Sequence, residues 1–229
     1  MLSSRLAMAA RNYKPSPDSL RKRLVLGCGA LAYDMVELIK RNDVLDQVID
    51  IQCLPAKLHH TPQFIAGEVE KVLAERAADY ADVYVAYGDC GTGGELDKVL
   101  DKYNATRLPG EHCFEFFAGA QDYADIVEDQ LGSFFLTDFL VKQFEHFVIE
   151  GLGLDRYPEL FDVYFEHYTQ MVYLAQTRDP ELEAKARQCA EDFGMNYVYR
   201  YVGIDAIQPL VKGLSSIPIE LETSRAGNV

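Results

Sequence analysis

Short apolar runs alternate with helical spacing of apolar residues over the first half of the chain. The runs that predict buried strands lie at 24–26, 48–54 and 82–87, and a weaker one lies at 105–108. Apolar residues recur at helical spacing over 30–40, after Thr61-Pro62 and over 95–103. The side-chain oxygen of Thr61 is expected to cap its helix, because threonine before proline suits a helix start. Strands that alternate with helices of this length imply right-handed crossovers and a mostly parallel sheet.

The second half of the chain is richer in aromatic residues and mainly helical from 116 to about 173. Helices are expected over 138–150, 158–168 and 180–193, and a late strand over 197–202. Asp138 is expected to be the N-cap of the first of these helices. The aromatic density indicates core packing, with a ring-stacking pocket as the alternative.

These elements together predict a doubly wound α/β fold. Its sheet should be mostly parallel with helices on both faces, and its C-terminal half should be helical and rich in aromatics. A chain of 229 residues fits one domain or two small ones. We expect a flexible segment over 1–20, a single α/β domain over 21–212 and an irregular tail over 213–229.

The charge balance narrows the range of partners. Acidic residues outnumber basic ones by 36 to 22, which gives a formal charge of −14. Nucleic-acid phosphates and anionic lipid surfaces attract Lys and Arg, so neither is expected as a partner. No apolar run reaches the roughly 18–20 residues that span a bilayer, and the first residues lack a secretory apolar core. We therefore expect a cytoplasmic protein, whose five cysteines are reduced thiols suited to metal binding or reactivity.

Four of the five cysteines fall at predicted strand ends. Cys28 follows the first strand and Cys53 ends the second. Cys90 lies in the turn after the third strand, and Cys113 follows the weaker fourth one. The carboxyl ends of parallel strands share the edge of the sheet at which ligands bind, so all four thiols should project toward one crevice. The alternative is that they are small buried residues near turns; Cys189, within a predicted helix, is given no role.

Polar residues beside these cysteines extend the candidate site. His59 follows one of them closely, and Asp89 and His112 directly precede two others. Thiolate and imidazole ligands suit zinc, and thiolates suit a [4Fe–4S] cluster. Four thiolates would close a zinc site, whereas three would leave a position for water or substrate. As candidate catalytic groups, His59 is expected to transfer a proton or replace a ligand, and Asp89 and His112 to orient ligands.

Two glycine-rich turns offer further binding sites. Gly91, Thr92, Gly93 and Gly94 could form a nest of backbone N–H groups that holds an anionic part of a substrate or cofactor. Residues 27–32 match a loose dinucleotide fingerprint between strand and helix, with Asp50 where it could bind a ribose. The turn at 27–32 therefore predicts a competing function, the binding of a nucleotide.

The sequence resembles the DUF1638 family. The resemblance rests on the stretches 27–32, 53–59, 87–97, 110–113, 135–140, 151–155 and 173–177, which include the four strand-end cysteines and His59. It implies an association with corrinoid proteins and with methyltransferases of methylamine-type substrates, and so a role in one-carbon metabolism. The resemblance carries no catalytic residue assignment.

We therefore expect a metal-dependent enzyme, or an enzyme component, that handles methyl groups. It would act on a small-molecule substrate together with a corrinoid protein or a methyltransferase. Its zinc ion or [4Fe–4S] cluster would be held by Cys28, Cys53, Cys90 and Cys113. One alternative is a metallochaperone or assembly factor for a corrinoid methyltransferase, and another is a Rossmann-type nucleotide or S-adenosylmethionine binder. A homodimer through the aromatic helical half is also expected.

Overall fold

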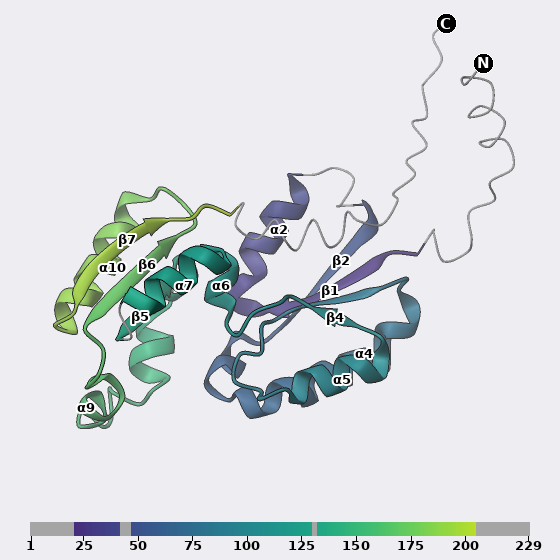
Figure 1. Ribbon diagram of the computed structural model, residues 1–229, viewed down its shortest axis with the longest axis horizontal. Coiled ribbons are helices and arrows are strands. Elements are labelled where there is room, and N and C mark those ends of the chain that lie inside the picture. Colours follow the sequence, from purple (N-terminus) through teal and green to yellow (C-terminus); the bar gives the residue numbers. More distant parts are fainter. Residues whose placement is uncertain (1–20, 42–46, 130–131, 205–229) are drawn as a thin grey trace, which may run out of the picture. The chain divides into compact units, whose positions relative to one another are not determined.

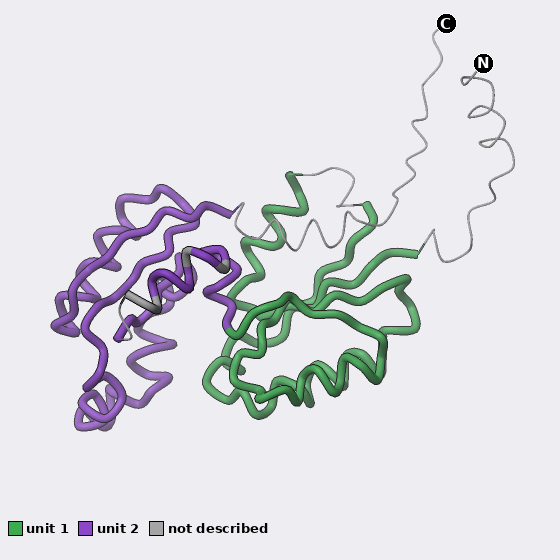
Figure 2. Tube along the Cα trace, viewed as in Figure 1, with its two compact units in different colours: residues 1–111 green, residues 112–229 purple. Residues whose placement is uncertain are grey.

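The computed structural model describes residues 21–41, 47–129 and 132–204. The chain divides into two compact units, residues 1–111 and 112–229 (Figure 2), and each is described here by itself. The segments predicted as flexible, 1–20, and as an irregular tail, 213–229, lie outside the described residues. A division into compact units does not test independent folding, so the single domain over 21–212 stays a prediction.

The first unit contains a parallel sheet of four strands. They are β1 (Arg23–Cys28), β2 (Ile49–Leu54), β3 (Val83–Ala86) and β4 (Thr106–Arg107). Their order in the sheet is β2-β1-β3-β4, and every neighbouring pair is parallel (Figure 1). Strand β2 therefore lies on one side of β1, and the chain then crosses to place β3 on the other side of β1. These are the four strands that the apolar runs predict.

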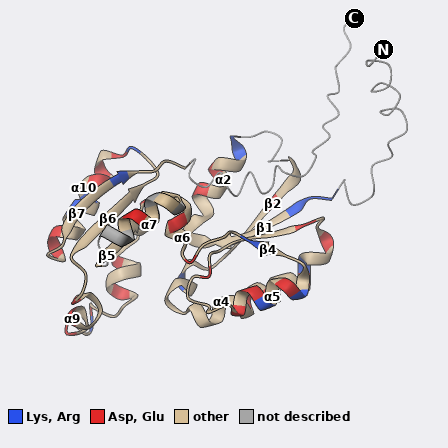
Figure 3. Cartoon of the chain, in the orientation of Figure 1, with Lys and Arg blue, Asp and Glu red and all other residues tan. Residues whose placement is uncertain are grey.

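Helices cover both faces of this first sheet, as predicted. The helical segments are η2 (Gly29–Leu31), α2 (Ala32–Lys40), η3 (Ala56–His60), η4 (Pro62–Phe64), α4 (Ile65–Arg76), η5 (Ala77–Asp79) and α5 (Glu95–Tyr103). Helices α4 and α5 lie side by side on the face opposite α2 (Figure 1). Their outer surfaces carry charges of both signs (Figure 3), and Lys102 on α5 pairs with Glu70 on α4 at 2.6 Å.

The start of α4 differs from the sequence expectation. The Thr61 side chain makes no capping hydrogen bond. Instead its backbone carbonyl accepts a hydrogen bond from Phe64 N–H at 3.0 Å, and the 3-10 turn η4 leads into the helix. At the start of α4, Ile65 is buried and Phe64 is exposed.

The second unit contains a parallel sheet of three strands, in the order β5-β6-β7. The strands are β5 (Ser133–Thr137), β6 (Gln170–Ala175) and β7 (Asn196–Tyr201). Its helices are α6 (Cys113–Ala118), α7 (Ala120–Asp129), α8 (Asp138–Lys142), the π-helix η6 (Glu145–Glu150), α9 (Leu160–Phe165) and α10 (Pro180–Asp192). The region predicted as mainly helical therefore also contains β5 and β6, which the sequence analysis did not identify. The α/β class with parallel strands is confirmed, and the strands form two sheets.

The aromatic residues of the second unit pack its core. The rings of Phe161 and Phe165 each meet Phe193 edge-on, with 5.0 Å between centroids. Cys189 is buried in the same cluster, and burial raises the pKa of its thiol to about 11. Core packing therefore accounts for these rings and for the fifth cysteine. No helix within the described ranges is long and apolar enough to cross a membrane.

Candidate thiol site at the carboxyl edge of the first sheet

Three of the predicted cysteines lie at the carboxyl edge of the first sheet. Cys28 is the last residue of β1, Cys53 is the penultimate residue of β2, and Cys90 follows β3. None of the three forms a disulfide bond. The strand order reverses between β1 and β3, and in open parallel sheets the crevice at such a reversal is where ligands bind. We call Cys28, Cys53 and Cys90 the thiol cluster.

The thiols of the cluster influence one another electrostatically. Burial raises the pKa of the Cys28 thiol, and the nearby Cys90 raises it further. Burial also raises the pKa of Cys53, with a further contribution from Cys28. Cys28 and Cys53 therefore keep their protons at neutral pH in the absence of a cation. A bound metal ion would supply the positive charge that displaces those protons.

The turn that carries Cys90 has an unusual backbone. Cys90 has φ +50°, in the left-handed region that a residue with a side chain seldom adopts, and Gly91 follows with φ +81°. Two hydrogen bonds to the loop after β4 hold the turn: Cys90 N–H donates to the Glu111 carbonyl at 2.7 Å, and Asp89 N–H donates to the Gly110 carbonyl at 3.0 Å. A strained residue that is held this firmly beside a binding edge is typical of a functional position.

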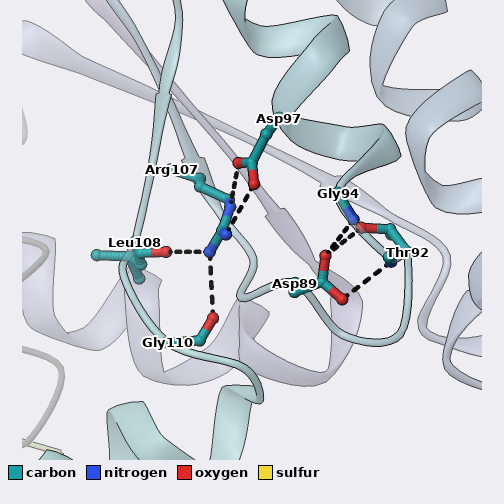
Figure 4. Close-up of polar contacts among 8 residues, drawn as sticks. Asp89, Thr92, Gly94, Asp97, Arg107, Leu108 and Gly110 are labelled. Carbon is teal, nitrogen blue, oxygen red and sulfur yellow. Dashed lines mark hydrogen bonds and ion pairs between the residues drawn. The ribbon is translucent and has the colours of Figure 1, made fainter.

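The carboxylate of Asp89 occupies the glycine-rich turn. It accepts hydrogen bonds from the N–H groups of Gly93 at 3.0 Å and Gly94 at 2.9 Å, and from the Thr92 hydroxyl at 2.8 Å (Figure 4). These bonds, led by the one from Gly94, hold the pKa of Asp89 below its ordinary value. The predicted nest over Gly91–Gly94 therefore already holds an anion, which is the protein's own.

Arg107 connects this turn to the end of β4. Its guanidinium donates two hydrogen bonds to the carboxylate of Asp97, at 2.6 and 3.0 Å. It also donates to the carbonyls of Leu108 at 3.0 Å and Gly110 at 3.1 Å (Figure 4). Because Gly110 is also bonded to Asp89, Arg107 supports the loop that positions Cys90.

This ion pair predicts a dependence of stability on pH. The hydrogen bonds from Arg107 hold the pKa of Asp97 below its ordinary value. The pair therefore contributes its full stability above the unfolded carboxyl pKa of about 3.9, and loses it as the pH falls through the folded value. We expect Asp97→Asn to lower the melting temperature at pH 6, with the difference from wild type shrinking as the pH approaches 3. A difference in melting temperature between the variant and wild type that stays constant from pH 6 to pH 3 would contradict this assignment.

Tyr87 is a member of the site that the sequence analysis missed. It directly follows β3, is only 2% exposed, and its hydroxyl has no hydrogen-bond partner among the described residues. Burial raises its pKa, and the three cysteines of the cluster raise it further. Tyr87 also lowers the pKa of Cys28 in the way that a hydrogen-bond donor does. The two side chains therefore lie close together, although their geometry falls short of a formed hydrogen bond.

Comparison with known proteins identifies the family. The family model described as "Protein of unknown function (DUF1638)" matches residues 53–211. The chain belongs to the DUF1638 family. Comparison with curated proteins gives no match. The DUF1638 match includes Cys53, Cys90 and Cys113, whereas Cys28 and the glycine-rich stretch 27–32 lie before it.

The remaining predicted site residues of this DUF1638 protein lie in η3 and at the start of α6. His59 is exposed in η3, where its ring lies 6.0 Å from that of His60. His112 and Cys113 begin α6 in the second unit, and the ring of His112 lies edge-on to Tyr123 at 6.5 Å. Their roles at the site stay predictions. Within residues 21–41, 47–129 and 132–204, no three His, Cys, Asp or Glu side chains are already arranged as metal ligands.

The dinucleotide fingerprint at 27–32 has another explanation in this DUF1638 structure. A Cβ atom on Gly29 would lie 2.9 Å from the Leu54 carbonyl oxygen, so this glycine permits close approach to the chain's own backbone. Asp50 lies near the start of β2, at the opposite end of the strand from the crevice. It accepts hydrogen bonds there from Lys22 at 2.7 Å and from the Tyr80 hydroxyl at 3.0 Å. Asp50 therefore does not occupy the position of a ribose-binding acid.

A second polar cluster lies at the carboxyl edge of the second sheet. The carboxylate of Asp138 is 5% exposed and accepts hydrogen bonds from the Tyr173 hydroxyl at 2.7 Å and from Gln176 N–H at 3.0 Å. It also accepts two from Thr177, at 3.0 Å from N–H and 2.5 Å from the hydroxyl. The expectation that Asp138 is the N-cap of α8 is wrong, because the Thr137 side chain accepts the capping bond, from Leu140 N–H at 3.3 Å. Asp138 instead joins β5 to β6, through two stretches on which the resemblance to DUF1638 rests.

Proposed function

We propose that the thiol cluster is the centre of a metal-dependent enzyme, or of an enzyme component, that binds zinc or a [4Fe–4S] cluster. One observation supports the proposal: three neighbouring parallel strands carry Cys28, Cys53 and Cys90 at or just past their carboxyl ends, on one edge of the first sheet. Thiolates are the preferred ligands of both metal centres. Reduced cysteines of this kind require a reducing compartment, so the proposal includes a cytoplasmic location.

The number of thiols in the cluster supports a reactive centre. Three protein ligands on zinc leave one of its four positions open for water or substrate, as in catalytic zinc sites. Cys28 is buried, whereas Cys53 and Cys90 are only partly buried. A small molecule could therefore reach the cluster from the side of Cys53 and Cys90. The ligands would have to draw together around the ion, because the side chains are not already set at ligand geometry.

The proposed reaction class is the transfer of methyl groups in one-carbon metabolism, with a corrinoid protein or a methyltransferase as partner. A metal-bound thiolate stays ionised at neutral pH and is the nucleophilic form of cysteine. It is therefore a suitable acceptor for a methyl group. The chemistry of the thiols supports this class, and the choice of partner follows from the resemblance alone.

The first experiment measures the metal and acid-labile sulfide of the full-length protein purified without oxygen. We expect either about one zinc per chain without sulfide or about four iron and four sulfide per chain. Cys90→Ser and Cys53→Ser should each lose most of that content. Cys189→Ser is the matched control, because Cys189 is a buried free thiol in the core of the second unit.

The outcomes of this experiment are distinct. Loss of metal from the two cluster variants, with full content in Cys189→Ser, supports the proposal. Wild-type protein without metal or sulfide would overturn it, and so would cluster variants that keep their full metal content. A [4Fe–4S] cluster rather than zinc would change the metal and leave the site as proposed.

A further inference from the structure

The Tyr87 hydroxyl is a buried donor that lacks an acceptor. Its oxygen is shielded from solvent and has no hydrogen-bond partner in the part of the chain that the structure describes. A buried polar group without a partner costs free energy, and native proteins contain few of them. Such a group calls for an explanation in terms of the hydrogen-bond partner that it has in the functional state of the protein. The charged groups that act on its pKa are the three cysteines of the thiol cluster.

The register of the sheet places Tyr87 beside Cys28. Strands β1 and β3 are parallel neighbours, and their last paired residues are Gly27 and Ala86. Cys28 follows Gly27 as the last residue of β1, and Tyr87 follows Ala86 directly after β3. Residues opposite each other on neighbouring parallel strands point to the same face of the sheet, so these two side chains share a face. The paired residues Gly27 and Ala86 are 59 positions apart in the sequence.

We infer that Tyr87 is a positioning residue of the thiol cluster, whose O–H donates a hydrogen bond to the Cys28 sulfur once that sulfur is a metal-bound thiolate. The inference rests on the proposed function. A neutral thiol is a weak acceptor, which agrees with the hydroxyl's lack of a formed hydrogen bond. A thiolate is an ionised acceptor, and hydrogen bonds to ionised groups are shorter and stronger than neutral ones.

The hydrogen bond would change the properties of the bound metal. Groups that donate to ligand sulfurs orient the ligand and adjust its donation to the metal. In iron–sulfur centres, hydrogen bonds to the sulfurs help to set the reduction potential. Tyr87 would therefore hold the Cys28 sulfur in place and draw electron density away from the metal. The same effect would make Cys28 less nucleophilic than Cys53 and Cys90, whose sulfurs are left for the substrate.

The test compares Tyr87→Phe with wild type, using Co²⁺ as a spectroscopic probe of the metal site in the full-length protein. The change removes one oxygen atom and keeps the ring. We expect Co²⁺ to bind about tenfold or more weakly, because the lost bond is to an ionised acceptor. The sulfur-to-cobalt charge-transfer band should move to longer wavelength, because the thiolate becomes a better electron donor. The metal-free variant should be no less stable than wild type, because the hydroxyl has no partner to lose.

Tyr197→Phe is the matched control. The Tyr197 hydroxyl is also buried without a partner among the described residues, but it lies in the second unit, and the groups that influence its pKa include no cysteine. Tyr197→Phe should leave the Co²⁺ affinity and the charge-transfer band unchanged.

Each result has one meaning. Weaker Co²⁺ binding and a shifted band in Tyr87→Phe, with neither in Tyr197→Phe, support the inference. If Tyr87→Phe matches wild type in both, or if its metal-free form is the less stable one, the inference is overturned and the proposed metal site stands. If wild-type protein shows no thiolate-to-cobalt band and also contains no iron or acid-labile sulfide, both the inference and the proposed function are overturned.

Discussion

Replacing Asp138 by alanine should lower the free energy of unfolding by about 3–5 kcal/mol, which is the range for removing one partner of a buried charged network. The carboxylate accepts hydrogen bonds from four donor groups on Tyr173, Gln176 and Thr177. Alanine leaves these donors without their acceptor in a largely buried site, and each buried donor left unpaired costs about 1–3 kcal/mol. The connection between the ends of β5 and β6 would be lost with them.

Urea unfolding followed by far-ultraviolet circular dichroism measures this loss, since the chain has no tryptophan for fluorescence. Tyr173→Phe removes a single donor and should cost less, about 1–2 kcal/mol. Asp162→Ala is the control, because Asp162 is an exposed acidic residue in the first turn of α9 and should cost less than about 1 kcal/mol. Equal losses in Asp138→Ala and Asp162→Ala would show that the network does not stabilise the second unit.

Replacing Gly29 by alanine should lower the free energy of unfolding by about 1–3 kcal/mol, as expected for a methyl group forced into occupied space. The new Cβ would lie 2.9 Å from the Leu54 carbonyl oxygen and 3.0 Å from the Ala56 nitrogen. Both are backbone atoms, so relief requires the end of β1 to move away from the segment after β2. That movement separates Cys28 from Cys53, so the variant should also bind metal less tightly.

Gly67→Ala is the control with the opposite sign. Gly67 lies in α4, and a Cβ there would meet no atom within 4 Å. Alanine should therefore raise the stability by about 0.5–1 kcal/mol, which is the helix propensity difference. The thermal midpoints of the two variants provide the comparison. A Gly29→Ala protein that is as stable as wild type would contradict the close approach described above.

The sequence predicted the first unit in detail because each of its elements carries a local signal. Helix α5 spans Glu95–Tyr103, as expected from its apolar spacing. The apolar runs at β1 and β3 are covered by helices on both faces, which is why they show no alternation of polar residues. Strand β6 has the same fully buried pattern, but it lies in an aromatic-rich region. Periodicity alone cannot separate such a buried strand from a buried helix there.

The site was only partly predictable, because some of its features depend on contacts between distant segments. The position of cysteines at strand ends is a local feature, and parallel strands place three of them at one edge of the first sheet. Tyr87 becomes a neighbour of Cys28 only through the pairing of β1 with β3. The glycine-rich turn is a good anion nest in its local sequence, yet Asp89 fills it from within. Pattern analysis identifies such a nest but not the group that occupies it.

The division of strands between the two sheets has a consequence for how the protein is made. In the described residues, β1 to β4 all precede residue 112 and β5 to β7 all follow it. Parallel strands need crossover connections, so the contacts of each sheet are distant in sequence and slow to form. A ribosome releases the N-terminal half first, and that half already contains every strand of its own sheet. The buried strands around Cys28 can therefore pair during synthesis, and their apolar edges are not left open to aggregation while the second half is translated.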